Sequence, residues 1–96
     1  MTRWLLADEA VADLNRLTEF LLQSAPEAAV GTVDLILDAL HILVDHPLVG
    51  RPLLQGLREL VISRGRTGYL ALYRYDDTAD VVLVLALRHQ RESDYH

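Results

Sequence analysis

The chain of 96 residues is 51% hydrophobic, contains no cysteine and has a formal net charge of −5. Its length fits one small domain over residues 1–96 with a single core, and the lack of cysteine excludes disulfides and thiolate metal sites. Asp8, Glu9 and Asp13 interrupt any signal-peptide core. No apolar run approaches the roughly 18 residues of a membrane helix, so we expect a cytoplasmic protein without membrane contact.

Charge is distributed unevenly along the chain. All nine basic residues are arginines; residues 1–50 carry two of them against eight acidic residues, whereas residues 51–74 carry five against Glu59 alone. Overall acidity argues against general nucleic-acid binding, which needs many phosphate contacts. An arginine patch suits a specific contact, because the guanidinium group offers a planar fork of donors. A compositional bias of the genome explains the missing lysine equally well.

Two amphipathic helices are predicted in the acidic half. After a short first strand at residues 3–6, apolar spacing predicts a helix over about residues 8–24, and Pro26 starts a second helix that runs to about residue 45. The tight turn between them predicts a helical hairpin. The apolar stripes are Val11, Leu14, Leu17 and Leu21 in the first helix and Val30, Val33, Leu37, Leu40 and Val44 in the second.

Three apolar runs follow a connector at residues 47–56 that contains prolines and glycines. They span about residues 57–62, 69–75 and 81–87, and turn residues separate them, as between strands. The last run is apolar on both faces, which predicts a central strand. The order β-α-α-β-β-β indicates an α+β fold in which a helical hairpin packs on one face of a mainly antiparallel sheet.

Three side-chain groups suggest chemistry, but each has a structural interpretation that we favour. Acids and a histidine on the second helix form a solvated face in preference to a metal site, because metal ligands normally come from several elements. Acids between the last two strands suit a turn and lack the pattern of a calcium loop. Tyrosines on a strand favour sheet packing, with hydroxyls reaching water, over base stacking. The groups are Asp34, Asp38, His41 and Asp45; Asp76, Asp77 and Asp80; and Tyr69, Tyr73 and Tyr75.

The best chemical candidates are polar residues in and after the last two strands. A ribonuclease needs arginines for the scissile phosphate and a histidine or tyrosine that moves protons. The candidates are Arg74, Arg88, His89, Arg91 and Tyr95.

The expected hairpin register disfavours a compact acid–base site among these candidates. A turn at residues 76–80 places Arg74 near Val82, whereas His89 lies near residues 67 and 68. The alternative is a salt-bridged strand end, in which Arg88 or Arg91 pairs with Glu59 or Glu92.

Four segments in order resemble the RelE/ParE superfamily of bacterial toxins. They are PLVGR (47–51), LREL (57–60), GYLALYRY (68–75) and VLALRHQRE (84–92), and with the element order the resemblance covers nearly the whole chain. It implies a small α+β toxin of a type II toxin–antitoxin module, held inactive in a hetero-oligomer with its antitoxin. RelE-like members cut messenger RNA in the ribosome, whereas ParE-like members poison DNA gyrase and lack the full set of catalytic residues.

The resemblance is closer to the ParE branch, because the chain has no lysine, is acidic overall and ends in RHQRE and a short tail. This branch implies a gyrase inhibitor that needs no cofactor and restrains growth, as in plasmid stabilisation, without enzymatic activity or sequence-specific nucleic-acid binding of its own. The RelE-like alternative implies catalysis by Arg74, His89 and Tyr95. A third alternative is an inactive member that serves only as a binding module.

For the gyrase inhibitor we expect a protein-contact surface in place of an active site. Its residues would come from the loop between the strands predicted at residues 57–62 and 69–75 and from the end of the last strand. They are Arg64, Arg66, Arg88, His89 and Arg91.

Overall fold

The computed structural model describes residues 1–64 and 67–90, except for the side chains of residues 63, 64 and 67. Its elements are β1 (Arg3–Leu6), α1 (Asp8–Ser24), α2 (Pro26–Asp45), β2 (Arg51–Pro52), a 3-10 turn (Leu54–Gly56), β3 (Leu57–Arg64), β4 (Thr67–Asp76) and β5 (Val81–His89). In this part of the chain no helix is both long and apolar enough to cross a membrane.

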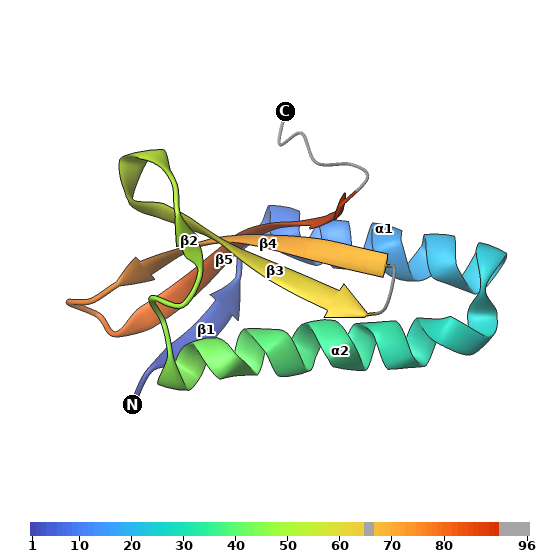
Figure 1. Ribbon diagram of the computed structural model, residues 1–96, viewed down its shortest axis with the longest axis horizontal. Coiled ribbons are helices and arrows are strands. Elements are labelled where there is room, and N and C mark those ends of the chain that lie inside the picture. Colours follow the sequence, from blue (N-terminus) through green and yellow to red (C-terminus); the bar gives the residue numbers. More distant parts are fainter. Residues whose placement is uncertain (65–66, 91–96) are drawn as a thin grey trace.

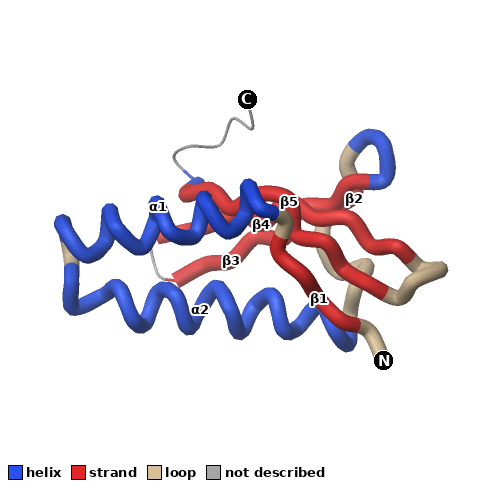
Figure 2. The backbone as a smooth tube through the Cα atoms, turned by 180° about the vertical axis from the view of Figure 1, so that it is seen from behind, coloured by secondary structure: helices blue, strands red, loops and turns tan. Residues whose placement is uncertain are grey.

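The five strands form one sheet in the order β1-β5-β4-β3-β2. β1 pairs with β5 in parallel, and the other neighbours pair antiparallel. The antiparallel helices α1 and α2 cover one face of this sheet, as Figures 1 and 2 show from opposite sides. The predicted α+β class, the helical hairpin and the central position of β5 are therefore confirmed, whereas the short β2 lies inside the predicted connector.

The core lies between the helices and the inner face of the sheet. Tyr73, Val82 and Val84 are fully buried there. Ile36, Leu40 and Leu43 of α2 complete the same cluster from the helix side of the sheet. Each large apolar side chain buried in this core contributes about 1.5–3 kcal/mol to folding. Tyr69 and Tyr73 of β4 belong to the core, so these tyrosines serve sheet packing, as the sequence predicts.

The row of α2 that faces the core differs from the predicted stripe. Only Leu40 of that stripe is buried; Val30 is 73% exposed, and the other members are partly exposed. Periodicity shows that a helix is amphipathic, but the sheet and α1 decide which of two adjacent apolar rows they cover. The buried row consists of Ala29, Thr32, Ile36, Leu40 and Leu43.

A β-bulge in the β4–β5 hairpin changes the expected register. Tyr73 pairs with Val84 but Leu72 pairs with Ala86, so Leu85 is an extra residue. An extra residue reverses the alternation of side chains beyond it. Simple alternation along residues 81–87 predicts that Leu87 lies on the face opposite Val84, but the two are buried in the same core cluster.

The connector between α2 and β3 is fixed to the sheet by Tyr73. Its hydroxyl accepts a hydrogen bond of 2.8 Å from the backbone N–H of Gly50, and burial raises the pKa of this hydroxyl. A Cβ at residue 50 would lie 2.6 Å from the tyrosine oxygen, so the approach requires glycine. The expectation that this hydroxyl reaches water is wrong, because it satisfies a buried backbone donor.

We expect Tyr73→Phe to lower the free energy of unfolding by about 1–3 kcal/mol, because the N–H of Gly50 loses its acceptor inside the protein. Urea denaturation measures the change. Tyr75→Phe is the matched control, since the Tyr75 hydroxyl bonds to the partly exposed Asp80. Equal losses in both variants would contradict the role given to the Tyr73 hydroxyl.

Candidate functional site

The end of β5 is held by a carboxylate of α1. Pairing of β1 with β5 ends at Leu6 and Val84, and beyond it Asp13 accepts the backbone N–H of Leu87 at 3.0 Å. An unpaired strand edge otherwise leaves its donors without partners. The side chain of Asp13 therefore replaces β1 where that strand stops.

Arg88 forms an ion pair with the same carboxylate. Its guanidinium lies 2.5 Å from Asp13 Oδ2, and the two side chains are only 23% and 13% exposed. Arg88 thus takes part in a salt bridge at the strand end, as predicted, but the acid that the structure shows is Asp13 and not Glu59. Glu59 instead pairs with Arg51 at 2.8 Å, and Glu92 lies outside the described residues.

His89 and Arg74 are not brought together. His89 lies opposite Tyr69, and their rings meet edge to face with centroids 5.3 Å apart. Tyr69 belongs to the core, so His89 faces the helix side of the sheet, whereas Arg74 alternates with Tyr73 and lies on the outer face. The bulge puts His89 on the helix side, since an unbroken alternation from Val84 would turn it outward.

The other site residues predicted from the sequence fall where the structure gives no side-chain position. Arg66, Arg91 and Tyr95 lie outside the described residues, and so does the side chain of Arg64. Their assignment stays a prediction.

The arginines near the connector hold backbone in place. Arg58 donates to the carbonyl oxygens of Leu48 and Gly50 at 2.9 and 2.8 Å, and Arg74 donates to that of Gln55 at 3.4 Å. Gln55 has a φ of 62°, an unusual backbone conformation for a residue other than glycine. Two of the five arginines in residues 51–74 therefore serve to order the connector at residues 47–56.

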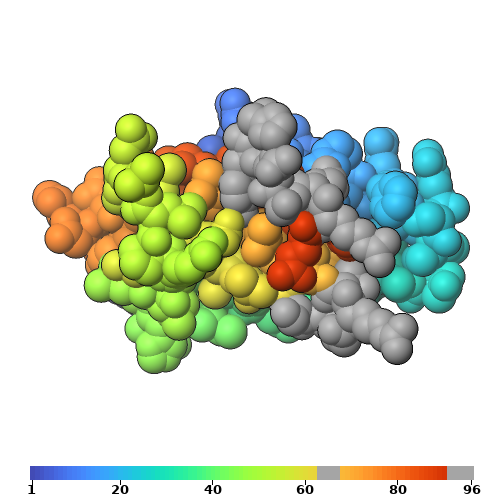
Figure 3. Space-filling model, turned by 45° about the horizontal axis from the view of Figure 1, so that its top comes forward, coloured from blue at the N-terminus to red at the C-terminus, as the bar shows by residue number. Residues whose placement is uncertain are grey.

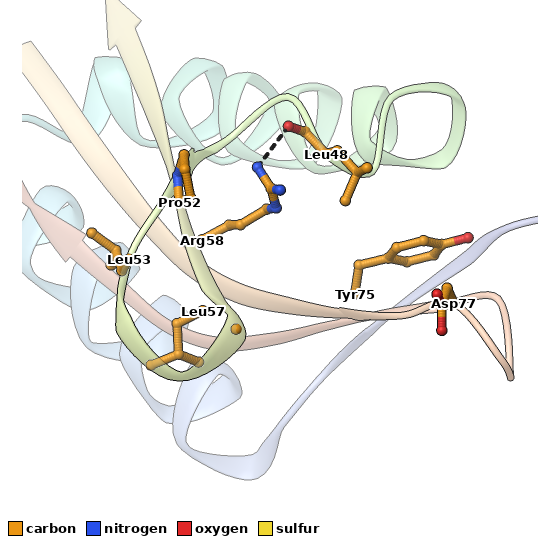
Figure 4. A pocket seen from close by; sticks show the side chains of 8 residues that line it. Leu48, Pro52, Leu53, Leu57, Arg58, Tyr75 and Asp77 are labelled. Carbon is orange, nitrogen blue, oxygen red and sulfur yellow. Dashed lines mark hydrogen bonds between the residues drawn. The ribbon is translucent and has the colours of Figure 1, made fainter.

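A hollow of about 330 Å³ lies between this connector and the end of β4. Figure 4 shows Leu53 and Leu57 on one side of it, Tyr75 and Asp77 on the other, and the bond from Arg58 to Leu48 along its wall. Leu54 beside it is 85% exposed. Such a hollow with mixed apolar and charged walls suits a side chain of a protein partner.

The hollow and the end of β5 are separate surfaces. Figure 3 shows the connector in green and the end of β5 in red on one side of the molecule, with other strands between them. The described residues therefore offer two distinct contact regions on this side.

The acidic residues of α2 lie on its exposed face, and Asp76 takes part in a turn. Asp34, Asp38, His41 and Asp45 are all exposed on α2, and no cluster in the described ranges 1–64 and 67–90 has the ligands for a metal ion. In the turn after β4, Asp76 accepts the backbone N–H groups of two following residues at 3.1 Å. These carboxylates stabilise a turn and a solvated helix face.

Asp80 connects the N-terminus to the β4–β5 turn. Its carboxylate accepts hydrogen bonds from Thr2 at 2.5 Å and from Tyr75 at 2.8 Å, and the amino group of Met1 lies 3.6 Å away. The Thr2 and Tyr75 hydroxyls lower the pKa of Asp80. The turn is predictable from the sequence but this network is not, because Thr2 and Asp80 lie 78 residues apart in the chain.

Comparison with known proteins gives consistent matches over nearly the full length. A family model described as the ParE toxin of the type II toxin–antitoxin system parDE matches residues 5–94. Toxin RelE3 of Caulobacter vibrioides is 39% identical over 87 residues, which cover 91% of this chain and 92% of that protein.

Two solved structures share the fold. The chromosomal ParDE toxin–antitoxin system from P. aeruginosa gives a TM-score of 0.76 at 24% identity, over 93% of this chain and 95% of that chain. The toxin–antitoxin complex RelBE2 from Mycobacterium tuberculosis gives a TM-score of 0.55 at 30% identity, over 92% and 96%. The two-helix, mixed-sheet architecture is thus the one found in toxins of such complexes.

We expect Asp13→Ala to reduce the free energy of unfolding by about 1–3 kcal/mol, because it leaves the N–H of Leu87 without its acceptor and the partly buried guanidinium of Arg88 without its ion pair. Glu19→Ala is the control, since Glu19 is an exposed acid of the same helix and its loss should change stability by less than about 0.5 kcal/mol. Denaturant titration distinguishes them. If the two variants unfold alike, Asp13 does not hold the end of β5.

The lowered pKa of Asp80 predicts a pH dependence of stability. Its ionised form is favoured by folding, so the contribution is complete above the unfolded pKa of 3.8 and is lost as pH falls through the lower folded pKa. The difference in free energy of unfolding between wild type and Asp80→Asn should therefore narrow on acidification below pH 3.8. Asp77→Asn, in the same turn, is the control. If its difference in free energy of unfolding from the wild type narrows equally on acidification, the effect belongs to the turn and not to the hydrogen bonds from Thr2 and Tyr75.

Proposed function

This chain belongs to the ParE toxin family of type II toxin–antitoxin systems, within the RelE/ParE superfamily, and we propose that it inhibits DNA gyrase and is neutralised by a cognate antitoxin. The match to the ParE family model over residues 5–94 supports this branch. Both solved relatives are toxin–antitoxin assemblies, which supports an antitoxin partner. Gyrase and the antitoxin would both be met in the cytoplasm.

The separation of Arg74 from His89 is the observation that carries the proposal. Cleavage of a phosphodiester needs a cation at the phosphate beside a group that transfers protons. Arg74 lies on the outer face of the sheet and contacts Gln55, whereas His89 packs against Tyr69 on the other face. Tyr69, which pairs with His89, lies five residues before Arg74 on β4, which corresponds to about 16 Å along the strand.

The neighbouring cation at the strand end is also occupied. Arg88 is bound to Asp13, so its charge is largely balanced. A messenger RNA in the ribosome would meet a chain of net charge −5, and unbalanced acidity repels phosphates. A protein target avoids this difficulty, because shape and local charge decide its binding.

The proposed contact with gyrase uses the surface expected from the sequence. Arg64, Arg66, Arg88, His89 and Arg91 would supply its polar groups, and the contacts of Asp13 with Leu87 and Arg88 fix the end of β5 that carries His89. The connector with its hollow would add a second contact region, with apolar and charged walls, on the same side of the molecule.

A RelE-like ribonuclease is the second candidate. The name of the relative Toxin RelE3 favours it, and so do His89 and Tyr95, which fall where the resemblance places catalytic residues. An inactive member that only binds its antitoxin is the third.

We expect purified protein to inhibit supercoiling by gyrase, or to cause cleavage of the DNA, and to leave message intact in a translating extract. The variants Arg74→Ala, His89→Ala and Tyr95→Ala should likewise leave the message intact, because the wild type itself cleaves no RNA. Both assays use the same preparation at matched concentrations.

Cleaved message that disappears in His89→Ala would make the ribonuclease correct and the gyrase proposal wrong. Antitoxin binding without any growth defect on expression would indicate the inactive member. Each of the three candidates therefore has its own result.

A further inference from the structure

A row of four side chains crosses the outer face of the sheet, one from each of four neighbouring strands. Leu5 of β1 pairs with Leu83 of β5. On β4, Arg74 pairs with Leu83 on one side and with Leu57 of β3 on the other. Residues that pair across neighbouring strands point to the same face of a sheet. Leu5, Leu83, Arg74 and Leu57, here called the outer row, therefore lie side by side over about 14 Å.

The outer row is accessible and takes no part in the core. Leu5 is 49% and Leu83 is 37% exposed, Leu57 is partly exposed and Arg74 is exposed. None of the four belongs to the core cluster, whereas Tyr73 beside Arg74 does. In the described part of the chain both helices lie on the other face of the sheet (Figures 1 and 2). Three leucines thus remain partly in water, where a partner could bury them with a gain in free energy.

Arg74, inside the row, is a cation that is held in place without a carboxylate. Its guanidinium donates to the carbonyl oxygen of Gln55 at 3.4 Å, and no ion pair among residues 1–64 and 67–90 includes it. By contrast, Arg88 at the end of β5 is paired with Asp13. Protein interfaces often have at their centre an arginine that apolar neighbours shield from water. The outer row has this composition.

The distribution of charge favours a partner that brings a carboxylate to the row. Together α1 and α2 carry eight acidic residues and one basic residue, Arg16. The outer face near the row carries Arg74 and Arg3, which lies two residues before Leu5. Asp76 lies on this face as well, but its carboxylate accepts backbone N–H groups of the turn. An acidic surface is therefore attracted to the outer row and repelled by the helices.

RNA and a second copy of the chain fit the row less well. A phosphate backbone requires several cations along its path, whereas the row offers one cation among leucines. Two copies that met face to face through the row would bring their Arg74 side chains together, and this repulsion opposes a closed dimer.

We propose that the outer row is a contact site for gyrase. Arg74 pairs with a carboxylate of gyrase, and Leu5, Leu57 and Leu83 pack against apolar side chains around that carboxylate. The inference rests on the proposed function and adds the face of the sheet that binds and the chemistry of the gyrase surface that meets it. The row is continuous with the hollow beside the connector, because Leu57 lines both.

Binding of the labelled full-length protein to purified gyrase, followed by fluorescence anisotropy, tests the row. Arg74→Glu should weaken binding roughly thirtyfold, because a carboxylate would then meet a carboxylate. Leu5→Ser should weaken binding roughly fivefold, because less apolar surface is buried.

Matched variants on α1 serve as controls. Arg16→Glu makes the same change of charge, and Leu22→Ser makes the same apolar-to-polar change at a residue that is 55% exposed. Both positions are exposed on α1, so neither variant should alter gyrase binding. Thermal unfolding verifies that all four variants are folded.

The comparison of Arg74→Gln with Arg74→Glu separates binding from a purely structural role. Both variants lose the bond from the guanidinium to Gln55, but only glutamate repels the carboxylate of gyrase. Arg74→Glu should therefore bind clearly more weakly than Arg74→Gln. Equal losses would mean that Arg74 only orders the connector, and would overturn the proposal.

Three further results would overturn the proposal. The first is equal gyrase binding by the row variants and the α1 variants. The second is cleavage of message that Arg74→Glu abolishes and Leu5→Ser retains, because the face would then hold a phosphate. The third is self-association in sedimentation velocity that Arg74→Glu abolishes, because the occupant would then be a second copy.

Growth arrest on expression without an antitoxin separates this inference from the proposed function. Arg74→Glu and Leu5→Ser should relieve the arrest, and Arg16→Glu and Leu22→Ser should not. If this pattern holds while purified gyrase is neither bound nor inhibited, only the identity of the target is contradicted. If the wild type inhibits gyrase and the row variants inhibit it equally, only the contact site is contradicted.

Discussion

The arrangement of the last strand depends on the contacts that the carboxylate of Asp13 makes with it. It joins α1 to β5 at the point where β1 ends, by accepting the N–H of Leu87 and pairing with Arg88. These contacts fix the helix to the strand through Asp13 and Leu87, which lie 74 residues apart in the sequence. A cationic side chain that could otherwise have contacted a phosphate is used for this structural purpose.

The bulge at Leu85 acts together with this contact. It turns His89 toward Tyr69 and the helix side, while Arg74 stays on the outer face. The end of β5 therefore presents a backbone held in a fixed position and not an assembled acid–base pair. This geometry, with the ParE family match, supports a toxin that acts by binding a protein. The connector is fixed to the sheet by Tyr73 and Arg58.

Local signals made most of the fold predictable. Pro26 separates the helices, the acids of residues 76–80 form a turn, and alternation marks the strands, because each signal acts through neighbouring residues. What the sequence did not predict depends on distant residues: the row of α2 that the sheet covers, the bulge, the Asp13–Arg88 pair and the bond from Gly50 to Tyr73. The sequence singles out Arg88 and His89 as candidate site residues, but their contacts with Asp13 and Tyr69 carry no local signal.

The account predicts that the protein forms a complex with gyrase and not with the ribosome. Labelled protein can be mixed with purified gyrase and ribosomes, and the mixture separated by sedimentation in a sucrose gradient. The label should travel with gyrase, in a fixed ratio once gyrase is saturated. Label that travels with the ribosomes while gyrase remains free of it would contradict the account.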